Sequence, residues 1–291
     1  MFSPEGPTLR ELAVQALSSV ERGYDLLAPK FDHTPFRTPD TVLESVAKAL
    51  GPLGPFEDGL DLCCGTGTGT DVLAGLCHRS VTGVDFSAGM LDVARRGATG
   101  PGGRQPMTAD GPGGREAMTA DGPGRRQAGA AEGRGGRQTA AAGGPGVAWV
   151  RGDARALPFT AAFDLVVSFG AFGHFLPREL PGLFGQVHSV LRPGGRFAFP
   201  VLAPPPATSP GFWMLLGFDA AMRVRNAVWR PPFVMYYRAF RLGLVMEELT
   251  RAGFVVDLQA LPEFGWRGDA SPRARLVVAR RPEGAIPPQA A

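Results

Sequence analysis

The stretch GLDLCCGTGTGTDVL, residues 59–73, places a group of glycines between two apolar runs. The run before these glycines has the character of a buried parallel strand, and TDVLAGLC, residues 70–77, has that of a helix. Gly65, Gly67 and Gly69 can take positive φ angles and have no Cβ, so a ligand can lie directly against their backbone. The stretch therefore predicts a strand, a turn and a helix of the kind that holds a nucleotide in α/β proteins.

Strand and helix patterns alternate along the rest of the chain. We expect strands near residues 59–64, 81–85, 147–151, 163–169, 195–202, 254–260 and 274–280. Helical patterns cover residues 8–28, 39–50, 69–78, 87–96, 177–191, 211–229 and 242–252. This alternation predicts an α/β fold of the Rossmann-like, doubly wound type, with a mostly parallel seven-stranded sheet and helices on both faces. A ligand of such a sheet binds beyond the carboxyl ends of the strands.

One segment, residues 98–146, interrupts this pattern. MTADGPGGR at residues 107–115 recurs as MTADGPGRR at 118–126, within a tract of Gly, Ala, Arg, Gln and Pro. Such a tract buries too little apolar surface to offset the loss of backbone entropy on folding. We therefore expect a disordered, low-complexity insertion, with a binding arm for RNA or protein as the weaker alternative.

Composition excludes several classes of protein. The net charge is +3, and no dense Lys/Arg stripe with interleaved aromatic residues suggests a nucleic-acid partner. The longest apolar stretch, residues 211–218, is far shorter than the ~20 residues that cross a bilayer, so stable membrane insertion is not expected. The N-terminal residues do not have the pattern of a secretory signal. The odd number of cysteines, Cys63, Cys64 and Cys77, suits reduced thiols, and we expect a cytoplasmic protein.

Acidic residues indicate which ligand the glycine turn holds. The dinucleotide fingerprint G-x-G-x-x-G fails at its third glycine, because position 70 is Thr70. Instead, Asp61 lies within the first strand and Asp85 ends the second, at the distance from Gly65 at which a carboxylate reaches ribose hydroxyls. A third acid, Asp153, follows the third strand.

Five motifs in order resemble those of the class I S-adenosylmethionine-dependent methyltransferases. They are GLDLCCGTGTG (59–69), VTGVDFSAGMLDVAR (81–95), VRGDARALPF (150–159), FDLVVSFGAFGHFL (163–176) and LRPGGRFAF (191–199). The resemblance covers most of the chain outside the insertion and residues 203–238, and it implies an enzyme of class EC 2.1.1 with S-adenosyl-L-methionine as cofactor. One departure is Cys63, where the family commonly has glycine.

The resemblance also implies roles for individual residues. Asp61 would border the methionine part of the cofactor, Asp85 would bind the ribose hydroxyls, Met90 would pack on the adenine and Asp153 would accept from the adenine amino group. The N-terminal GYDLLAPKFDH, residues 23–33, resembles the segment that closes over the cofactor in quinone-biosynthesis methyltransferases, with Tyr24 and Phe31 as its contacts. The full set of expected cofactor residues is Asp61, Cys63, Gly65, Thr66, Gly67, Asp85, Phe86, Met90, Asp153, Ala154 and Tyr24.

By this resemblance the chain divides into four parts. Residues 1–50 form an N-terminal helical lid, and residues 51–97 with 147–291 form the methyltransferase domain. Residues 98–146 are the insertion between the two halves of that domain. Residues 203–240 are an insertion that covers the substrate, because their aromatic residues exceed the packing needs of one helix.

The acceptor of the methyl group is expected to be a small apolar or aromatic molecule. Its expected contacts are Phe169, Phe172, Trp213, Tyr236 and Tyr237. His174 is the candidate general base, because an imidazole titrates near neutral pH, and His33 is the weaker candidate. Ser168 stands where catechol-type enzymes need a carboxylate for Mg²⁺, so no metal is expected.

Several alternatives stay open from the sequence. A structural role for His174 is as consistent with its position as a catalytic one. The chain could also be an NAD(P)-binding oxidoreductase, or a catalytically silent methyltransferase-like partner protein. Arg223, Arg225 and Arg230 flank the aromatic residues, so peripheral contact with a membrane that carries a lipid or quinone acceptor is a further alternative. The sequence does not indicate the oligomeric state.

Overall fold

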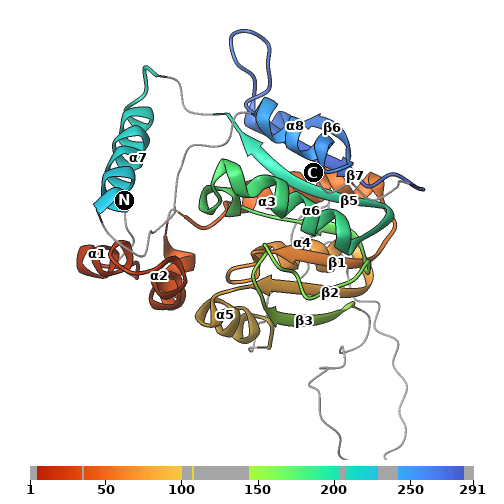
Figure 1. Ribbon diagram of the computed structural model, residues 1–291, viewed down its shortest axis with the longest axis horizontal. Coiled ribbons are helices and arrows are strands. Elements are labelled where there is room, and N and C mark those ends of the chain that lie inside the picture. The colour runs from red at the N-terminus through yellow and green to blue at the C-terminus, as the bar shows by residue number, and fades with distance from the viewer. Residues whose placement is uncertain are drawn as a thin grey trace, which may run out of the picture.

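The computed structural model describes residues 5–34, 36–99, 107, 144–203, 207–228 and 242–284. A seven-stranded sheet runs through them, and helices pack on both of its faces (Figure 1). Its strands are β1 Phe56–Leu62, β2 Cys77–Asp85, β3 Gly146–Arg151, β4 Phe163–Val167, β5 Leu191–Leu202, β6 Val255–Ala260 and β7 Ala274–Arg280. The predicted Rossmann-like fold and all of its expected strands are confirmed, although β2 and β5 begin four residues earlier than expected.

The strand order across the sheet is β3-β2-β1-β4-β5-β7-β6. Strands β1 to β5 pair in parallel, and β7 runs antiparallel to both of its neighbours, β5 and β6. The chain builds one half of the sheet from β1 to β3 and then returns to the other side of β1 with β4. The point between β1 and β4 is therefore the topological switch point, where open α/β sheets bind their ligands.

Eight α-helices connect and flank the described strands. They are α1 Leu9–Ala16, α2 Val20–Leu27, α3 Asp40–Leu50, α4 Thr68–Leu76, α5 Ala88–Thr99, α6 Leu180–Val190, α7 Pro210–Val228 and α8 Leu242–Arg251. Two short 3₁₀ helices also matter for the site: η1 Ala28–His33 in the N-terminal region and η3 Ala171–His174 after β4. No helix among the described residues is both long and apolar enough to cross a membrane.

Strand β4 shows how the sheet binds its two helical layers together. Leu165 packs in a cluster with residues of α3 and α4, including Leu73. The next residue, Val166, packs in another cluster with residues of α6 and α8, including Val187. Because successive side chains of a strand point to opposite faces, a strand covered on both faces must be apolar at almost every position. The run FDLVV meets this requirement.

The N-terminal helix expected over residues 8–28 is interrupted. Ser18 Oγ donates to the carbonyl of Val14 at 2.8 Å, and the Ser19 side chain accepts from the backbone N–H of Arg22 at 3.3 Å, which caps the start of α2. Serine favours such caps over helix interiors, so the pair ends α1 and begins α2. From here on, the lid denotes residues 5–34, because α3 packs its buried Val46 and Leu50 into the core of the domain.

A network of ion pairs lies at the amino ends of the central strands. Asp58 accepts from the guanidinium groups of Arg79 and Arg192, and Arg192 also donates to Asp164 at 2.8 Å. Asp164 accepts in addition from the backbone N–H of Asp58 at 3.0 Å. Its carboxylate therefore lies at the opposite end of β4 from the switch point and takes no part in a site there.

Of the expected insertion, residues 100–106 and 108–143 lie outside the described residues. Met107 is described, and its backbone N–H donates to the carbonyl of Asp71 at 3.0 Å. Within residues 203–240, the described parts are Ala203 and residues 207–228, which include α7. The limits of the expected lid, insertion and cover remain predictions.

Candidate active site

A cavity of about 1190 Å³ lies beyond the carboxyl ends of β1, β2 and β4, at the switch point of the sheet. The lid covers one side of the cavity, the glycine turn after β1 forms its floor, and residues at the start of α3 and at the end of β5 complete it. Ligand pockets commonly enclose about 300–1,000 Å³. The cavity therefore has room for a cofactor and a second small molecule at the same time.

The glycine turn adopts the backbone that its sequence suggests. Gly65 has a φ of 52° and Gly67 a φ of 97°, both in the left-handed region that favours glycine. Gly65 faces open space, since a Cβ placed there would meet no atom within 4 Å. Gly69 has a different role, because a Cβ there would lie 2.6 Å from both Asp61 Oδ1 and Phe169 Cδ2. The first glycine leaves room for a ligand, and the third lets α4 pack closely under the cavity.

Cys63 also lies in the left-handed region, with a φ of 59°. This backbone angle gives the physical reason why glycine is common there in the family that the sequence resembles. The Cys63 side chain lines the cavity. Burial, together with the nearby Asp85 and Asp61 carboxylates, raises the pKa of the Cys63 thiol well above its usual value, so the thiol stays protonated at neutral pH.

Asp61 is the most deeply buried carboxylate of the cavity, with only 1% of its surface exposed. Its Oδ2 accepts from Thr70 Oγ1 at 3.0 Å, and no cationic side chain of the described residues pairs with it. Burial raises its pKa to about 7, and the neighbouring Asp71 and Asp85 charges add to the rise. A carboxylate in this setting is stabilised by a cationic group that enters the cavity.

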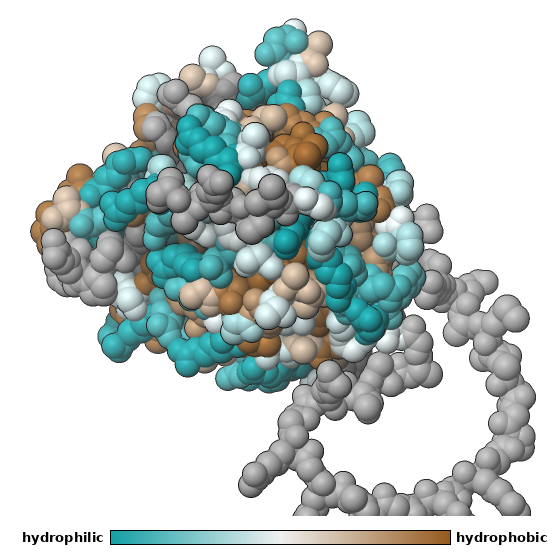
Figure 2. Space-filling view, turned by 45° about the vertical axis from the view of Figure 1, so that its right-hand side comes forward, coloured by the Kyte–Doolittle hydropathy of each residue, from teal (hydrophilic) through white to brown (hydrophobic). Residues whose placement is uncertain are grey.

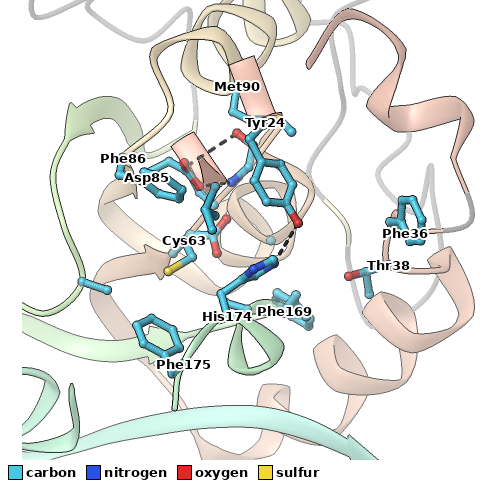
Figure 3. Close-up of a pocket in the computed structure, with 18 of the residues that line it drawn as sticks. Tyr24, Phe36, Thr38, Cys63, Asp85, Phe86, Met90, Phe169, His174 and Phe175 are labelled. Atoms are coloured by element: carbon cyan, nitrogen blue, oxygen red, sulfur yellow. Dashed lines mark hydrogen bonds between the residues drawn. The ribbon is translucent and has the colours of Figure 1, made fainter. Parts of the chain in front are cut away.

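Asp85 joins the end of β2 to the glycine turn. Its Oδ2 accepts from the backbone N–H of Gly65 at 2.9 Å, and its Oδ1 accepts from that of Ser87 at 2.9 Å. Burial raises the pKa of this carboxylate against the effect of both hydrogen bonds. A carboxylate can accept about four hydrogen bonds, so Asp85 has capacity left for hydroxyl groups of a ligand. Phe86 and the buried Met90 line the cavity beside it (Figure 3).

Asp153, expected at the adenine, is held by Arg155, which the sequence motifs did not single out. The Arg155 guanidinium donates to both Asp153 oxygens, at 2.7 Å and 3.0 Å, and to Glu179 at 3.1 Å. These hydrogen bonds lower the pKa of Asp153. Arg155 thereby ties the loop after β3 to the loop that precedes α6, and both loops line the cavity together with Ala154.

Lid side chains make hydrogen bonds with three different parts of the site. Tyr24 Oη lies 2.7 Å from His174 Nε2 in η3, a hydrogen bond drawn in Figure 3. Asp25 Oδ1 accepts from Ser87 Oγ at 2.6 Å and from the backbone N–H of Gly89 at 2.9 Å, at the start of α5. Asp32 Oδ1 accepts from Thr66 Oγ1 of the glycine turn at 2.7 Å.

Aromatic and apolar side chains line the other end of the cavity. Phe36 and Thr38 lie across the cavity from Asp85 and Phe86, and Phe169 and Phe175 lie near His174 (Figure 3). Leu202, at the end of β5, reaches the same cavity and is 46% exposed. This end therefore offers apolar contacts, whereas the end near Asp61 and Asp85 offers carboxylates.

The structure places the expected residues as follows. The cavity is lined by Tyr24, Phe31, Asp61, Cys63, Gly65, Thr66, Asp85, Phe86, Met90, Asp153, Ala154, Phe169 and His174. Gly67 does not line it and instead precedes α4 in the turn. Tyr236 and Tyr237 lie outside the described residues.

Three other candidates lie away from the cavity. Phe172 packs in the core, with its ring centroid 4.5 Å from that of Phe199. Trp213 is 62% exposed on α7, where its Nε1 donates to the carbonyl of Ala207 at 2.9 Å. His33 is exposed, with its Nδ1 3.3 Å from Glu5. We therefore correct the expected acceptor contacts of Phe172 and Trp213: one side chain fills the core between α6 and β5, and the other is held on the surface.

Several residues of the site were not predicted from the sequence, among them Asp25, Asp32, Phe36, Thr38, Arg155 and Phe175. Asp25 and Asp32 lie in the segment GYDLLAPKFDH, in which the sequence points only to the aromatic residues, because an acid on a helix surface carries no signal of its own. Phe36 lies just beyond that segment, where the chain turns into α3. Among the residues that the structure describes, no group of three or more His, Cys, Asp and Glu side chains is arranged to hold a metal ion.

Comparisons with known proteins agree with this geometry. A family model described as "Methyltransferase domain" matches residues 33–258 of the chain. Over 61 residues the chain is 44% identical to the phthiotriol/phenolphthiotriol dimycocerosates methyltransferase of Mycobacterium leprae (strain TN), a match that covers 21% of this chain and 22% of that protein. The match thus spans only about a fifth of the curated relative's length.

Two solved structures share the fold at low sequence identity. The SAM-dependent methyltransferase of Methanosarcina mazei is 16% identical, with a TM-score of 0.51 over 79% of this chain and 94% of that one. An O-methyltransferase family protein from Burkholderia thailandensis is 15% identical, with a TM-score of 0.54 over 91% of this chain and 61% of that one.

Proposed function

Because the chain belongs to the family of S-adenosylmethionine-dependent methyltransferases, we propose that it transfers the methyl group of this cofactor to a small apolar or aromatic molecule. The observation that carries the proposal is the division of one cavity into a carboxylate end and an aromatic end. The family assignment leaves the nicotinamide oxidoreductase alternative without support.

The carboxylate end suits the charge of the cofactor. Asp61 is buried beside the glycine turn without a cationic partner among the described residues, and S-adenosylmethionine carries a cationic amino group and a sulfonium. Asp85 has accepting capacity left for the ribose hydroxyls, and Phe86 and Met90 supply apolar surface for the adenine. Gly65 leaves open space beside them, so the cofactor can approach the backbone.

The aromatic end supports an apolar acceptor. Phe36, Phe169 and Phe175 line it, and Thr38 adds one hydroxyl for orientation. Few polar groups among many apolar ones is the usual composition of a small-molecule site. The mycobacterial relative, whose name gives phthiotriol and phenolphthiotriol dimycocerosates as acceptors, makes a lipid or a phenol a reasonable class to test.

The pair formed by Tyr24 and His174 is the proposed device for proton removal. When bound, the cofactor would supply an electrophilic methyl group to a lone pair of the acceptor. A hydroxyl or amine acceptor must then lose a proton, which Tyr24 Oη can take while it passes its own proton to His174 Nε2. Tyr24 Oη can donate to Nε2 before this step and accept from the protonated ring after it, so the contact at 2.7 Å persists in both states.

Binding and turnover test the proposal separately. Calorimetric titration of the full chain with S-adenosylmethionine and with NADH is expected to give heat of binding with the first alone. Incubation with the cofactor and with panels of alkylphenols and fatty alcohols, followed by mass spectrometry, is expected to reveal a product heavier by the mass of a methylene group. Cofactor binding without a product from any phenol or apolar panel member would contradict the acceptor class and leave the family assignment intact.

A further inference from the structure

Exposed apolar side chains gather on the lid and on α7. We define the apolar patch by its members, which are Val14, Leu17, Leu26, Trp213, Met214, Val224 and Val228. Met214 is 70% exposed and Val228 is 79% exposed. Elsewhere in the described residues, exposed large hydrophobic side chains are limited to Leu202, Val255 and Trp266. The apolar patch is thus a local concentration rather than the usual scatter of single residues.

The two parts of the apolar patch belong to one surface. Helix α7 lies beside α1 and α2 in Figure 1, on the side away from β6 and α8. Met222 of α7 packs in a cluster with Val20 and Tyr24 of α2, and Arg225 Nη2 donates to the carbonyl of Ser18 at 3.0 Å. Apolar surface also reaches the left margin of the molecule in Figure 2, on the same side.

Residues that line the cavity lie next to the apolar patch. Val20 and Tyr24, which support α7, also line the cavity, and so does the half-exposed Leu202 at the end of β5. Helix α2 therefore contacts both the helix that carries most of the apolar patch and the cavity.

Cationic side chains accompany the apolar patch. Arg10 on α1 and Arg22 on α2 are exposed, and so is Arg178 at the wall of the cavity. No carboxylate of the described residues pairs with any of these three, whereas Lys30 is paired with Glu11. Unpaired arginines beside exposed Trp, Leu, Met and Val side chains are the combination that binds the headgroup region of an anionic bilayer.

We propose that the apolar patch docks the protein on the surface of an anionic lipid bilayer. The apolar side chains of α7 and the lid would enter the boundary between headgroups and acyl chains, and Arg10 and Arg22 would contact lipid phosphates. The inference concerns binding alone, so it stands whether or not the proposed acceptor is correct. It also gives a reason for the surface position of Trp213, since tryptophan is favoured at membrane interfaces.

Flotation with lipid vesicles tests the proposal on the full chain without cofactor. We expect the protein to float with vesicles that contain phosphatidylglycerol and phosphatidylcholine, and to bind vesicles of phosphatidylcholine alone more weakly. The Arg10→Gln/Arg22→Gln variant should bind the anionic vesicles about 25-fold more weakly, because each arginine near such a surface contributes about fivefold. Higher salt should reduce the difference between the two proteins.

A second pair of variants separates the apolar part of the interaction. Met214→Glu/Val224→Glu should abolish flotation, and Val255→Glu, at a 53% exposed position on β6, should retain it. Circular dichroism checks that both variants are folded. The proposal is overturned if the wild-type chain does not float at low salt, or if the double glutamate variant floats like the wild type. A wild-type dimer that the double variant dissociates, without vesicle binding, would also overturn it and assign the patch to a second copy.

Discussion

Replacing Asp61 by asparagine tests the electrostatics of the cavity most directly. The folded chain raises the pKa of this carboxyl from 3.8 to about 7, mainly by burial. Between these pH values the folded state holds a proton that the unfolded state releases, so the unfolding free energy decreases as pH rises through this range. At pH 8 the carboxylate is charged in both states and its full destabilising effect is present.

The magnitude follows from the pKa difference. A rise of about three units corresponds to about 4 kcal/mol at pH 8, and to much less near pH 4. The asparagine side chain would be neutral at every pH and would retain an oxygen to accept from Thr70 Oγ1. We therefore expect Asp61→Asn to increase the unfolding free energy at pH 8 by up to about 4 kcal/mol, and to weaken S-adenosylmethionine binding because the attraction to its cationic groups is lost.

Urea unfolding followed by circular dichroism at pH 5 and pH 8 measures the effect. Asp58→Asn is the matched control, since the ion pairs with Arg79 and Arg192 lower the pKa of Asp58. The stabilising contribution of Asp58 is present above its unfolded pKa and is lost only at lower pH, so this variant should be less stable than the wild type at pH 8. An Asp61→Asn variant with the same stability difference from the wild type at both pH values would refute the reasoning.

Four further predictions concern the site and the insertion. Asp85→Ala should weaken cofactor binding about ten- to a hundredfold, measured by calorimetry, because hydrogen bonds to a charged acceptor are lost; an unchanged Kd would contradict the ribose assignment. His174→Ala should lower kcat by about 10²- to 10⁴-fold with cofactor affinity unchanged, and Tyr24→Phe should alter the pH dependence of kcat; a loss below about threefold in His174→Ala would assign the ring a structural role. Gly69→Ala should reduce the unfolding free energy by about 1–3 kcal/mol, because its Cβ would overlap the side chains beside it; equal urea midpoints would show that they move aside at little cost. Deleting residues 108–143 should preserve turnover and the unfolding midpoint, and a folded but inactive deletion variant would show that the insertion has a function.

The sheet could be predicted from the sequence because its signals are local. Each central strand is largely an apolar run of a length that suits a strand, and Asp85 at the end of β2 and Ser168 after β4 suit a turn. The break between α1 and α2 was harder to predict, because Ser18 and Ser19 act as caps only when the chain on either side already has helical periodicity. Helix propensity alone therefore extended one helix through a region where two helices form.

The carboxylate end of the cavity follows from the sequence better than the aromatic end does. Asp61 and Asp85 lie at the carboxyl ends of neighbouring parallel strands, and strand topology alone brings them together. Phe172 and Phe169 are only three residues apart, but the turn at η3 sends one ring into the core and the other into the cavity. The contacts of Asp25 and Asp32 join segments far apart in the chain, and no local pattern indicates such pairs.

The docked lid has a consequence for the order of events during synthesis. Asp32 contacts Thr66, which is 34 residues later, Asp25 contacts Ser87, 62 residues later, and Tyr24 contacts His174, 150 residues later. Thr66, Ser87 and His174 leave the ribosome in this order. At a translation rate of roughly 5–20 residues per second, His174 follows Tyr24 by roughly 8–30 s. The lid of a nascent chain can therefore meet the glycine turn first and the start of α5 next, while the contact of Tyr24 with His174 must wait until β4 and η3 have been made.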